Sequence, residues 1–511
     1  MFSLIIKSTH NKWVFFLCIK TIHVLQTKPK EIIVMKFNNF EKSFNKNAEV
    51  EKRDYEIATK TISLFYIDCL IDKPLFTNSI LNAILSANSI VIKEKKKSPL
   101  EILEKQIISA TIVKRITDIE TAKNEVLSGS VIITSKSDDF ALSVAVAGSM
   151  KRSINEPPTS AVVKGPREGF IEDINVNKAL IRKRLKTDEL SIEEMVVGNK
   201  TQTKINIIYI STIADEKVLE AVKDKIEKID IDGILDSFYI SEFLQRGQDK
   251  FFKRVGTTEK PDIAVAKLLE GRIAILVDGS PICLTVPFIL FEDLQSVEDY
   301  YDIPAKATLS RFIRFFGMFI SILLPGLYVA LESYHYKVLP INFLINLLGS
   351  LENLSLPPML EILFVIFLFD ILNEASVRMP KQLGMALSII GALILGDTAV
   401  QAGIISSPSI VVVAISGISL YIIPDQVPET SILRSLFAVI GGIAGFYGLL
   451  CASVVLVVYL ICVTSFGSPY LAPYAPSIPS DKKDGIIMSP ITDMNTRPYS
   501  ILNKNKKRTK K

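Results

Sequence analysis

The chain has 511 residues, of which 49% are hydrophobic and 22% charged, and its 59 Lys and Arg residues outnumber its 54 Asp and Glu residues by five. This composition excludes a disordered chain, a collagen-like repeat and a small disulfide-stapled protein. The mean hydropathy of +0.33 is too high for an ordinary soluble enzyme, and the charged fraction is too high for a chain that is membrane throughout, so we expect one soluble part and one membrane part.

The N-terminal segment, residues 1–50, is expected to be a leader. Its apolar run Trp13–Leu25 is interrupted by Lys20 and is not followed by a small-residue cleavage site, so it differs from a secretory signal. One interpretation is an inert extension upstream of an alternative start at Met35, and the other is a short membrane anchor. Residues 41–60 are predicted to be helical or loose, because charged side chains are frequent there.

Residues 51–305 are predicted to form a cytoplasmic α/β region of two subdomains, with a junction near 153–200 that includes Pro157 and Pro158. Apolar periodicity predicts strands at Ser63–Leu70, Ser130–Thr134 and Ile205–Ser211. It predicts helices at Ser79–Leu85, Asp215–Ile229 and Ala264–Leu269, the last capped by Gly271. A β-hairpin is predicted for Arg272–Pro287, with its turn at Asp278, Gly279, Ser280 and Pro281.

Long stretches without charge predict a helical membrane domain at 306–475, with four to six segments. These stretches are Phe315–Leu331, Gln382–Gly396, Thr398–Pro424 and Ser435–Ser480. A charged side chain at the bilayer centre costs about 2.5–3.5 kcal/mol, and a span needs about 20 apolar residues, so such stretches favour lipid. The last two hold predicted spans near Ile404–Ile423 and Leu436–Val463. Met359–Leu372, which contains Glu361 and Asp370, is expected to be interfacial or re-entrant.

The tail at 476–511 is basic, since Asp481–Lys511 has nine Lys or Arg and three Asp, a net charge of +6. A basic segment after a membrane helix is typical of the cytoplasmic side. With both ends inside, the number of spans should be even, four or six. We expect a solvated tail that acts as a topology signal, with binding to anionic lipid as the alternative. Because the positive charge is concentrated there, it indicates membrane orientation rather than nucleic-acid binding.

No motif in the soluble part predicts catalysis. The most distinctive run is Gly165, Pro166, Arg167, Glu168, Gly169 and Phe170. It matches neither a P-loop nor a dinucleotide fingerprint, and we favour a structural turn over a functional loop. The five cysteines form no CxxC pair and the three histidines lie far apart, so no metal, cofactor or enzymatic activity is expected.

A basic helix face is predicted directly after this run. It consists of Lys178, Arg182, Lys183, Arg184 and Lys186. One interpretation is a solvated or salt-bridged face, and the other is a patch that faces a partner or the membrane.

Small side chains recur every four residues in one membrane segment, at Gly384, Ser388, Ala392 and Gly396. Such a stripe lets helix backbones pack closely, and we favour packing within the chain over oligomer packing or a pore lining. Gly441 and Gly445 repeat the pattern. Asp397 is a candidate functional acid inside the membrane, with Arg378 or Lys381 as its partner. A second polar set comprises Glu361, Asp370, Glu374 and Arg378.

Several motifs follow one another in an order that is informative. The first is Glu156, Pro157 and Pro158, followed by Gly165–Phe170. Others are Thr258–Asp262, Leu269–Arg272, Asp278–Pro281, Asp299–Tyr301, Leu324–Leu331, Val377–Pro380, Ala399–Gly403 and Ser465–Pro473. Together they resemble the A subunits of spore germinant receptors, the GerA family, over about Ser63 to Pro476. The chain departs from the family pattern at Ser160, Lys337 and Ser376, which bears on ligand response or pairing.

The resemblance implies a nutrient sensor in the inner membrane of a dormant endospore. In this family the A subunit works with a permease-like B subunit and a lipoprotein C subunit, and small germinants trigger the release of ions and dipicolinate. We therefore expect a germinant receptor A subunit that forms a ligand-gated, ion-conducting homo-oligomer in membrane lipid. The alternative is a secondary transporter of a small solute or ion that uses Asp397 as its coupling acid.

Overall fold

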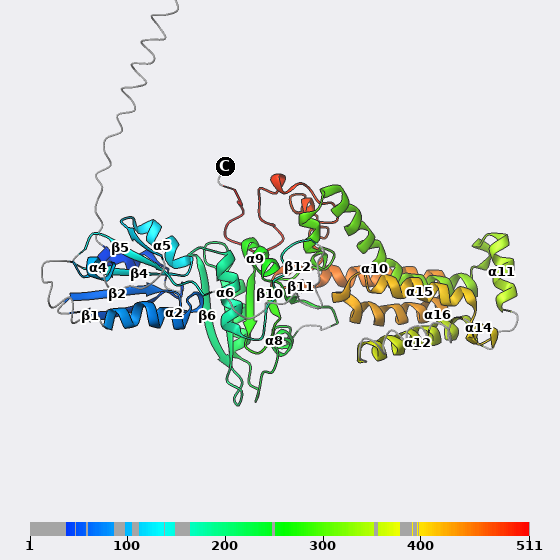
Figure 1. Cartoon of the computed structure of the whole chain (residues 1–511). Coiled ribbons are helices and arrows are strands. Elements are labelled where there is room, and N and C mark those ends of the chain that lie inside the picture. Colours follow the sequence, from blue (N-terminus) through cyan, green and yellow to red (C-terminus); the bar gives the residue numbers. More distant parts are fainter. Residues whose placement is uncertain are drawn as a thin grey trace, which may run out of the picture. The chain divides into compact units, whose positions relative to one another are not determined.

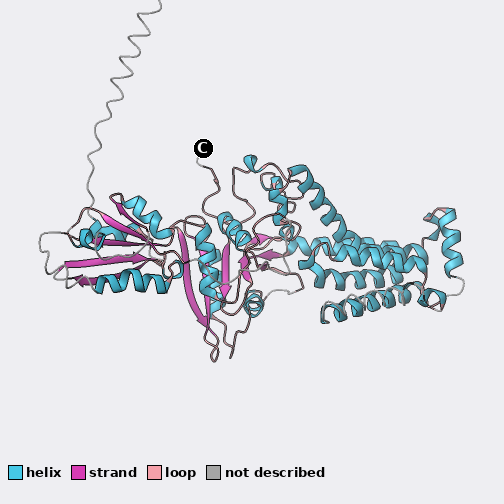
Figure 2. Cartoon of the chain, in the orientation of Figure 1, coloured by secondary structure: helices cyan, strands magenta, loops and turns pink. Residues whose placement is uncertain are grey.

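The computed structural model describes residues 37–45, 48–57, 60–85, 98–104, 112–136, 138–148, 164–247, 251–351, 356–378, 391, 396 and 398–509. The chain divides into two compact units. The first runs to Phe44 and continues over Val50–Gly148, while the second comprises Asn45–Glu49 and everything from Ser149 onward. Figure 1 follows the chain in sequence order, and Figure 2 shows its helices and strands.

The first unit is built on a five-stranded antiparallel sheet with the order β1-β2-β4-β5-β3. The strands are β1 (Glu51–Ile57), β2 (Lys60–Tyr66), β3 (Val113–Ile116), β4 (Ser130–Ser135) and β5 (Ala141–Ala145). The helical elements are η1 (Phe37–Ser43), η2 (Asp68–Leu70), α2 (Lys73–Phe76), η3 (Thr77–Leu81), α4 (Pro99–Ile102) and α5 (Ile119–Leu127). One sheet face packs on α2, η3 and α4, and the other packs on η1 and α5, so both faces are buried.

The start of the first unit differs from the sequence-based expectation. Residues 41–60 were expected to be helical or loose. The helical turn η1 does extend to Ser43, but Glu51–Ile57 form β1, an edge strand. Charged side chains are compatible with an edge strand, where they also oppose pairing with other chains. Within the predicted leader, Phe37 and Phe40 of η1 are buried in the core of this unit, so the described fold begins inside residues 1–50.

The second unit begins with another five-stranded antiparallel sheet, in the order β6-β7-β9-β10-β8. The strands are β6 (Leu190–Val197), β7 (Thr203–Ile210), β8 (Gly256–Thr258), β9 (Ile273–Val277) and β10 (Cys283–Val286). The helices are α6 (Ile174–Arg184), α7 (Glu216–Glu227), α8 (Ser237–Leu244) and α9 (Pro261–Glu270). Helices α7 and α8 cover one face, and α6 and α9 cover the other. Taken in chain order, the strands of the two sheets follow the same arrangement, so the topology is repeated.

The local predictions for this sheet are confirmed. Helix α7 buries Val218, Leu219, Val222 and Ile226, which are the four residues that the apolar period places on one face. Gly271 ends α9 in the left-handed conformation, with φ 101°. Strands β9 and β10 form the predicted antiparallel hairpin. An α/β region with two sheets that is followed by apolar helices is therefore the architecture of the chain, as expected.

A helical bundle follows the second sheet (Figures 1 and 2). Its elements are α10 (Pro304–Ser333), α11 (Ile341–Leu351), α12 (Pro358–Arg378), α14 (Ala399–Gln401), α15 (Ser407–Leu420) and α16 (Val427–Cys462). Helices α10, α12, α15 and α16 pack side by side. Among the described residues, two helices are long and apolar enough to cross a membrane, namely Pro304–Ser333 and Pro424–Cys462. Short helical turns precede or join these helices, as η5 (Leu290–Glu292), η6 (Val297–Tyr301), η7 (Tyr336–Val338) and η9 (Pro424–Gln426).

Helix α16 reverses direction at Gly445, whose φ of 59° and ψ of −153° are not helical. At a rise of about 1.5 Å per residue, a straight helix would separate Leu433 from Leu460 by about 40 Å. Both residues nevertheless line one apolar cavity with Phe252 and Leu290. The arms 427–444 and 446–462 therefore fold back on each other, and the single span expected near Leu436–Val463 is wrong.

Two further membrane segments differ from their sequence-based description. Helix α15 has 14 residues, about 21 Å, and is shorter than the span predicted near Ile404–Ile423. Its start is set by Ser406, whose hydroxyl accepts from the Ser409 N–H. The segment Met359–Leu372, expected to be interfacial or re-entrant, lies within the continuous 21-residue helix α12, which packs inside the bundle.

The tail is not solvated as expected, because its described part packs on the second sheet and the start of the bundle. It contains η10 (Asp481–Lys483) and η11 (Ile491–Asp493), and it is preceded by the short strands β11 (Thr464–Ser465) and β12 (Ser468–Pro469). Ile501 is fully buried against Ile289 and Ala472. The Asn503 side-chain amide donates to the Glu270 carbonyl at 3.1 Å. The prediction of a solvated tail followed from its many Lys and Arg residues, but apolar residues such as Ile501 anchor this segment.

Candidate functional site

The candidate site lies where the second sheet, the start of α10 and the tail meet. Its first part is the loop before α6, Gly165–Phe170. The Phe170 N–H donates to the Glu259 carbonyl at 2.7 Å, and Phe170 is buried against α6. The Asn177 side chain closes the following turn, because it accepts from the Ile171 N–H at 2.9 Å and donates to the Ile171 carbonyl. The loop is therefore held from both sides by the sheet layer, as a structural turn requires.

The same loop also contacts the residues that lead into the first membrane helix. The Lys164 ammonium lies 2.8 Å from a carboxylate oxygen of Asp302, two residues before α10. Gly165, at φ 122°, lies against the Tyr301 ring, and a Cβ on it would come within 2.9 Å of that ring. Among the remaining predicted loop residues, Gly169 is buried, Pro166 is half-buried and Arg167 is exposed. Glu156, Pro157 and Pro158 lie outside the described residues.

The basic face of α6 is salt-bridged within the chain. Lys178 and Arg182 are buried and contact the Glu49 carboxylate at 3.2 Å and 3.4 Å. Arg182 also donates to the Ala48 carbonyl at 2.9 Å. On the outer turn, the Arg184 guanidinium lies 2.8 Å from Glu168 of the loop, and Lys183 lies 3.5 Å from it. These pairings favour the salt-bridged interpretation of this face over a patch that faces a partner.

A buried charge cluster fixes the start of α10. Asp299 of η6 accepts from Arg311 at 3.0 Å and from Arg314 at 2.8 Å. Arg311 is completely buried and also contacts Asp484 of the tail at 2.9 Å. Burial disfavours the charged form of Asp299, but the hydrogen bonds from Arg314 and from the Ser296 N–H hold the pKa of its carboxyl below the ordinary value. The Asp299 carboxylate therefore joins the segment before α10, which we call the linker (residues 297–303), to two arginines of α10. One of these arginines, Arg311, also joins α10 to the tail.

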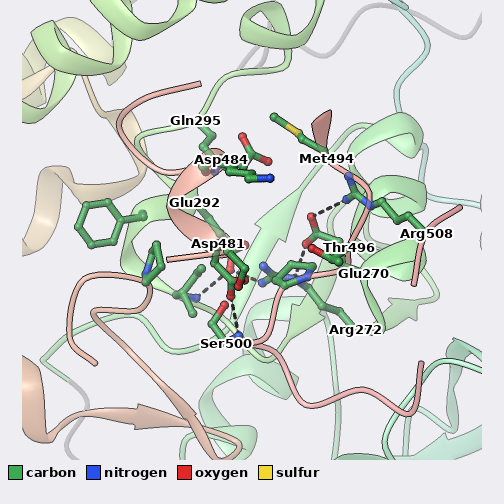
Figure 3. Close-up of a pocket in the computed structure, with 16 residues that line it drawn as sticks. Glu270, Arg272, Glu292, Gln295, Asp481, Asp484, Met494, Thr496, Ser500 and Arg508 are labelled. Atoms are coloured by element: carbon green, nitrogen blue, oxygen red, sulfur yellow. Dashed lines mark hydrogen bonds and ion pairs between the residues drawn. The ribbon is translucent and has the colours of Figure 1, made fainter. Parts of the chain in front are cut away.

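Next to this cluster is a small polar cavity of about 60 Å³ (Figure 3). Charged groups of both signs line it, mainly Glu270, Arg272, Glu292, Asp481, Asp484 and Arg508. Arg272 contacts both Glu270 and Glu292, and Arg508 reaches Glu270 at 3.3 Å from the tail. The Asp481 carboxylate accepts from the Ser500 N–H at 2.7 Å. The cavity is large enough for a few waters and lies between the start of the β9–β10 hairpin and the tail.

The charges around this cavity oppose one another. Burial raises the pKa of the Glu270 carboxyl above its ordinary value. Burial acts in the same direction on Glu292, but Arg272 and Lys267 more than offset it and hold the pKa of the Glu292 carboxyl below the ordinary value. Breaking one partner of such a buried pair leaves an uncompensated charge, which costs about 3–5 kcal/mol. These buried ion pairs favour a rigid structural connection over a catalytic centre.

The acids predicted in the membrane segments have different environments. Glu361 is fully buried, and its carboxylate accepts from the Ser406 N–H at 2.7 Å. Glu374 and Arg378 form an exposed pair one helical turn apart on α12. Asp370 contacts Arg434 of α16 at 2.7 Å, a buried partner that the sequence did not indicate.

Most of the predicted stripe of small side chains falls on residues without a described structure. Gly384, Ser388, Ala392, Asp397 and Lys381 lie outside the described residues. Gly396 is exposed, and a Cβ on it would meet no described atom within 4 Å. The repeat in α16 does mediate packing, since a Cβ on Gly441 would collide with the Gly326 backbone of α10. Small residues therefore do bring two helices together, at Gly326 and Gly441.

Sequence reasoning missed most of this site, the place where the second sheet, the start of α10 and the tail meet, which we call the junction from here on. In the sequence, Asp299 stands out only as part of the motif Asp299–Tyr301, and Asp484 only as one of three acids in a basic tail; no local pattern links either to Arg311 or Arg314. The signal that could have found them is a group of acids, Glu298, Asp299 and Asp302, directly before a long apolar helix whose first turns carry Lys306, Arg311 and Arg314. In the part of the chain that the structure describes, no group of three His, Cys, Asp or Glu residues is placed to hold a metal ion.

Comparison with known proteins gives a consistent result. The family model described as Bacillus/Clostridium GerA spore germination protein matches residues 38–500. The chain is 36% identical over 449 residues to spore germination protein KA of Bacillus subtilis (strain 168), which covers 88% of this chain and 82% of that protein. It is 32% identical over 448 residues to spore germination protein XA of Bacillus anthracis, covering 87% and 90%.

One solved structure is also similar. It is the crystal structure of the N-terminal domain of the A subunit of the Bacillus megaterium spore germinant receptor GerK3. The match has 26% sequence identity, covers 49% of this chain and 93% of that chain, and has a TM-score of 0.38.

Proposed function

Because this chain belongs to the GerA family of spore germination proteins, we propose that it is the A subunit of a receptor through which small nutrients start spore germination. The observation that carries this proposal is the family match over 38–500, which includes both sheets, the bundle and most of the tail. The relatives match most of this chain rather than a single part of it. No reaction is proposed, because the buried charged groups at this site form ion pairs with one another.

The junction supports a role in transmitting a signal between the α/β part and the helices. The Lys164–Asp302 pair and the Gly165–Tyr301 contact join the loop to the linker of α10, while Arg311 joins α10 to the tail. A displacement at the loop therefore acts on the first membrane helix directly. Two packings of the bundle with different affinity for a nutrient would be sufficient for gating.

The membrane placement rests on two arguments. Exposed apolar side chains cover the outer faces of α10 and α16, including Phe312, Ile313, Tyr447 and Val455, which is typical of contact with lipid or other helices. The tail contacts α9 through Asn503, so the tail and the second sheet lie on the same side of the membrane. A basic tail favours the cytoplasmic side, and we place the protein in the inner membrane of the spore.

The positions where the chain enters and leaves the bundle bear on the number of passages through the membrane. The described helices that run between its two ends are α10, α12, α15 and the two arms of α16. The chain enters the bundle next to the sheet at Pro304 and leaves it there at Val463, which supports an even number of passages. Five described passages favour six over four.

The partners follow from the family. We propose a complex with a permease-like B subunit and a lipoprotein C subunit, and assembly of several A subunits into an ion-conducting oligomer. The exposed apolar faces of α10 and α16 support further helix contacts, because a single bundle leaves them uncovered by other parts of the described chain.

The receptor role is tested by deletion and complementation in spores. Spores without the gene should lose dipicolinate release in response to at least one nutrient mixture, and a plasmid copy should restore it. If the deletion spores respond at the wild-type rate to every nutrient that the wild type recognises, the proposal fails. Detection of the protein in wild-type spores by immunoblot is the necessary control.

The loop contact has its own test with a matched control. Gly165→Ala places a methyl group against the Tyr301 ring at a φ of 122°. Gly279→Ala also introduces a side chain at a positive φ, 84°, but no atom lies within 4 Å of it. We expect spores with Gly165→Ala to germinate several-fold more slowly at normal protein abundance, and spores with Gly279→Ala to be unaffected. Equal germination of the two variants would contradict transmission through this contact.

A further inference from the structure

Two acidic residues meet in the bundle at the end away from the second sheet. Glu361 of α12 is fully buried, and one carboxylate oxygen accepts from the Ser406 N–H at 2.7 Å while the other has no hydrogen-bond partner. Ser406 is the N-cap of the 14-residue helix α15, so Glu361 lies at the positive end of that helix. The peptide dipoles at this end of α15 therefore face the Glu361 carboxyl group.

Glu332, near the end of α10, is the second acid. Both of its carboxylate oxygens are buried without a hydrogen-bond partner, and it interacts electrostatically with Glu361. One helical turn earlier on α10, Tyr328 is 9% exposed, and its hydroxyl is buried next to the hydroxyl groups of Ser406 and Ser409. Residues four apart lie on one helix face, so Tyr328 and Glu332 present their polar atoms together.

Tyr328 and Glu332 line a common cavity of about 220 Å³. Its remaining lining is apolar and consists of Leu324, Leu327, Leu331, Leu339, Leu347 and Val412. An empty cavity that is apolar throughout would be an ordinary packing defect. Here two acidic groups lie on or next to it, and both Glu332 oxygens and one Glu361 oxygen have no hydrogen-bond partner, which is costly in a bundle unless something satisfies them.

The charges on the neighbouring elements do not compensate the two acids. In the part of the chain that the structure describes, no Lys, Arg or His forms an ion pair with Glu332 or Glu361. Arg434 of α16 is paired with Asp370, and the His335 ring contacts Phe446 and Tyr447. The N-terminus of α15 supports one negative charge, and the second carboxylate requires a positive charge from elsewhere or a proton.

We propose that Glu332, Glu361 and Tyr328 form a binding site for one small monovalent cation, either an alkali ion or a primary ammonium group. All the available ligands are oxygen atoms, which suit hard cations, and the two carboxylates supply the charge. An ammonium group would place its substituent among the leucines of the cavity. The proposal goes beyond the receptor role and does not depend on it, because it rests on the chemistry of the bundle alone.

The test uses the purified full-length chain in lipid nanodiscs at constant pH and ionic strength. Its melting temperature is measured in potassium, sodium, methylammonium and N-methyl-D-glucamine chloride, the last being too large for the site. We expect a higher melting temperature in at least one of the first three salts, since a ligand that binds only the folded state stabilises it. Stabilisation by potassium or sodium identifies an alkali ion, and stabilisation by methylammonium alone identifies an ammonium group.

Three variants assign the effect to the site. Glu332→Gln should abolish the response, with cation affinity reduced by more than about tenfold, and should melt higher than the wild type in N-methyl-D-glucamine because the repulsion is removed. Tyr328→Phe should weaken the response. Glu374→Gln, an exposed acid on the same helix as Glu361, is the matched control and should respond like the wild type.

Two outcomes would overturn the proposal. If the wild type melts at the same temperature in all four salts but shifts with pH, a proton rather than a cation occupies the site. If Glu332→Gln retains the wild-type response, the cation binds elsewhere. Glu361→Gln is not needed for the decision, because loss of the contact with the N-terminus of α15 could by itself prevent folding. Germination does not enter the measurement, so failure of the cation response leaves the receptor role to its own test.

Discussion

Individual charged side chains at the junction are buried in pairs of opposite sign, and this sets their chemistry. Asp299 forms ion pairs with Arg311 and Arg314, and Glu292 forms ion pairs with Arg272 and Lys267. Buried pairs add little net stability compared with apolar packing, but each is costly to separate. Their effect is to oppose intermediate positions of the linker, the tail and α10, which suits a part that transmits a change between two states.

Asp293 differs from Asp299 and Glu292 in the direction of its pKa shift, and it predicts a pH dependence. Burial raises the pKa of its carboxyl to about 6, although Lys253 lies 3.5 Å away and Gln426 donates to it at 2.6 Å. An unfolded Asp has a pKa of about 3.9, so the folded chain binds more protons between the two values. Stability contributed at this residue is therefore present below about pH 4 and is lost as the pH rises to about 6.

We expect the wild-type melting temperature to fall relative to that of Asp293→Asn as the pH rises from about 4 to about 6, and the difference to stay constant above that. Thermal unfolding of both chains in detergent measures this difference, in which other titrating groups cancel. Asp224→Asn, at an exposed acid of α7, should give a curve parallel to the wild type. Parallel curves for Asp293→Asn as well would show that this carboxyl does not titrate in the window.

Among the elements, α10 and α16 show how glycine shapes the bundle. Gly326 and Gly441 let the two backbones touch, and Gly445 lets α16 reverse. Hydropathy alone treats the stretch around Gly445 as one span, because a single glycine barely changes the mean of an apolar window. The reversal is visible only in the backbone, where φ 59° and ψ −153° lie close to a region that is accessible essentially to glycine alone.

Replacing Gly445 by Ala should therefore destabilise the bundle by about 1–3 kcal/mol, since the residue must adopt a strained backbone. The added Cβ would also come within 3.1 Å of the Tyr334 ring and 3.2 Å of the His335 ring. Melting temperature and membrane abundance measure the effect. The control is Gly349→Ala in α11, where no described atom lies within 4 Å and Ala favours the helix. Equal melting temperatures for the two variants would refute a fold-back at Gly445.

On the scale of the whole molecule, the tail closes the second unit. It connects η10 and η11 to the sheet, the linker and α10, so that residues at the end of the chain hold the entrance to the bundle. Lys504 pairs with Glu216 on the surface, where such pairs contribute little, while Ile501 provides buried apolar contact. The apolar residue rather than the basic ones should therefore determine whether the tail stays in place.

Ile501→Ala should cost about 2–5 kcal/mol and lower the melting temperature, because the side chain is fully buried. Ile491→Ala is a control with the same chemistry in the same tail, and Ile491 is 61% exposed, so its effect should stay within about 0.5 kcal/mol. Unfolding of the purified chain in detergent distinguishes them. If both substitutions were equally mild, the tail would be a solvated segment after all.

The amino-acid sequence by itself determined the features that depend on neighbours along one element. Apolar periodicity was sufficient to predict α7, because the buried face of an element depends on residues two to four positions apart. The turn residues and Gly271 were likewise sufficient to predict the β9–β10 hairpin and the end of α9. Spacing of charges was sufficient to separate an α/β part from apolar helices, and a series of motifs over Ser63 to Pro476 was sufficient for the family.

Only the tertiary structure decided which distant residues meet. Arg182 finds Glu49, Arg311 finds Asp484, and Glu332 approaches Glu361 across segments that no local pattern connects. The reversal at Gly445 and the docking of Ile501 have the same origin. Each is selected because it satisfies or buries a group that its own element leaves open, and that free energy is gained only when the parts of the chain have packed together.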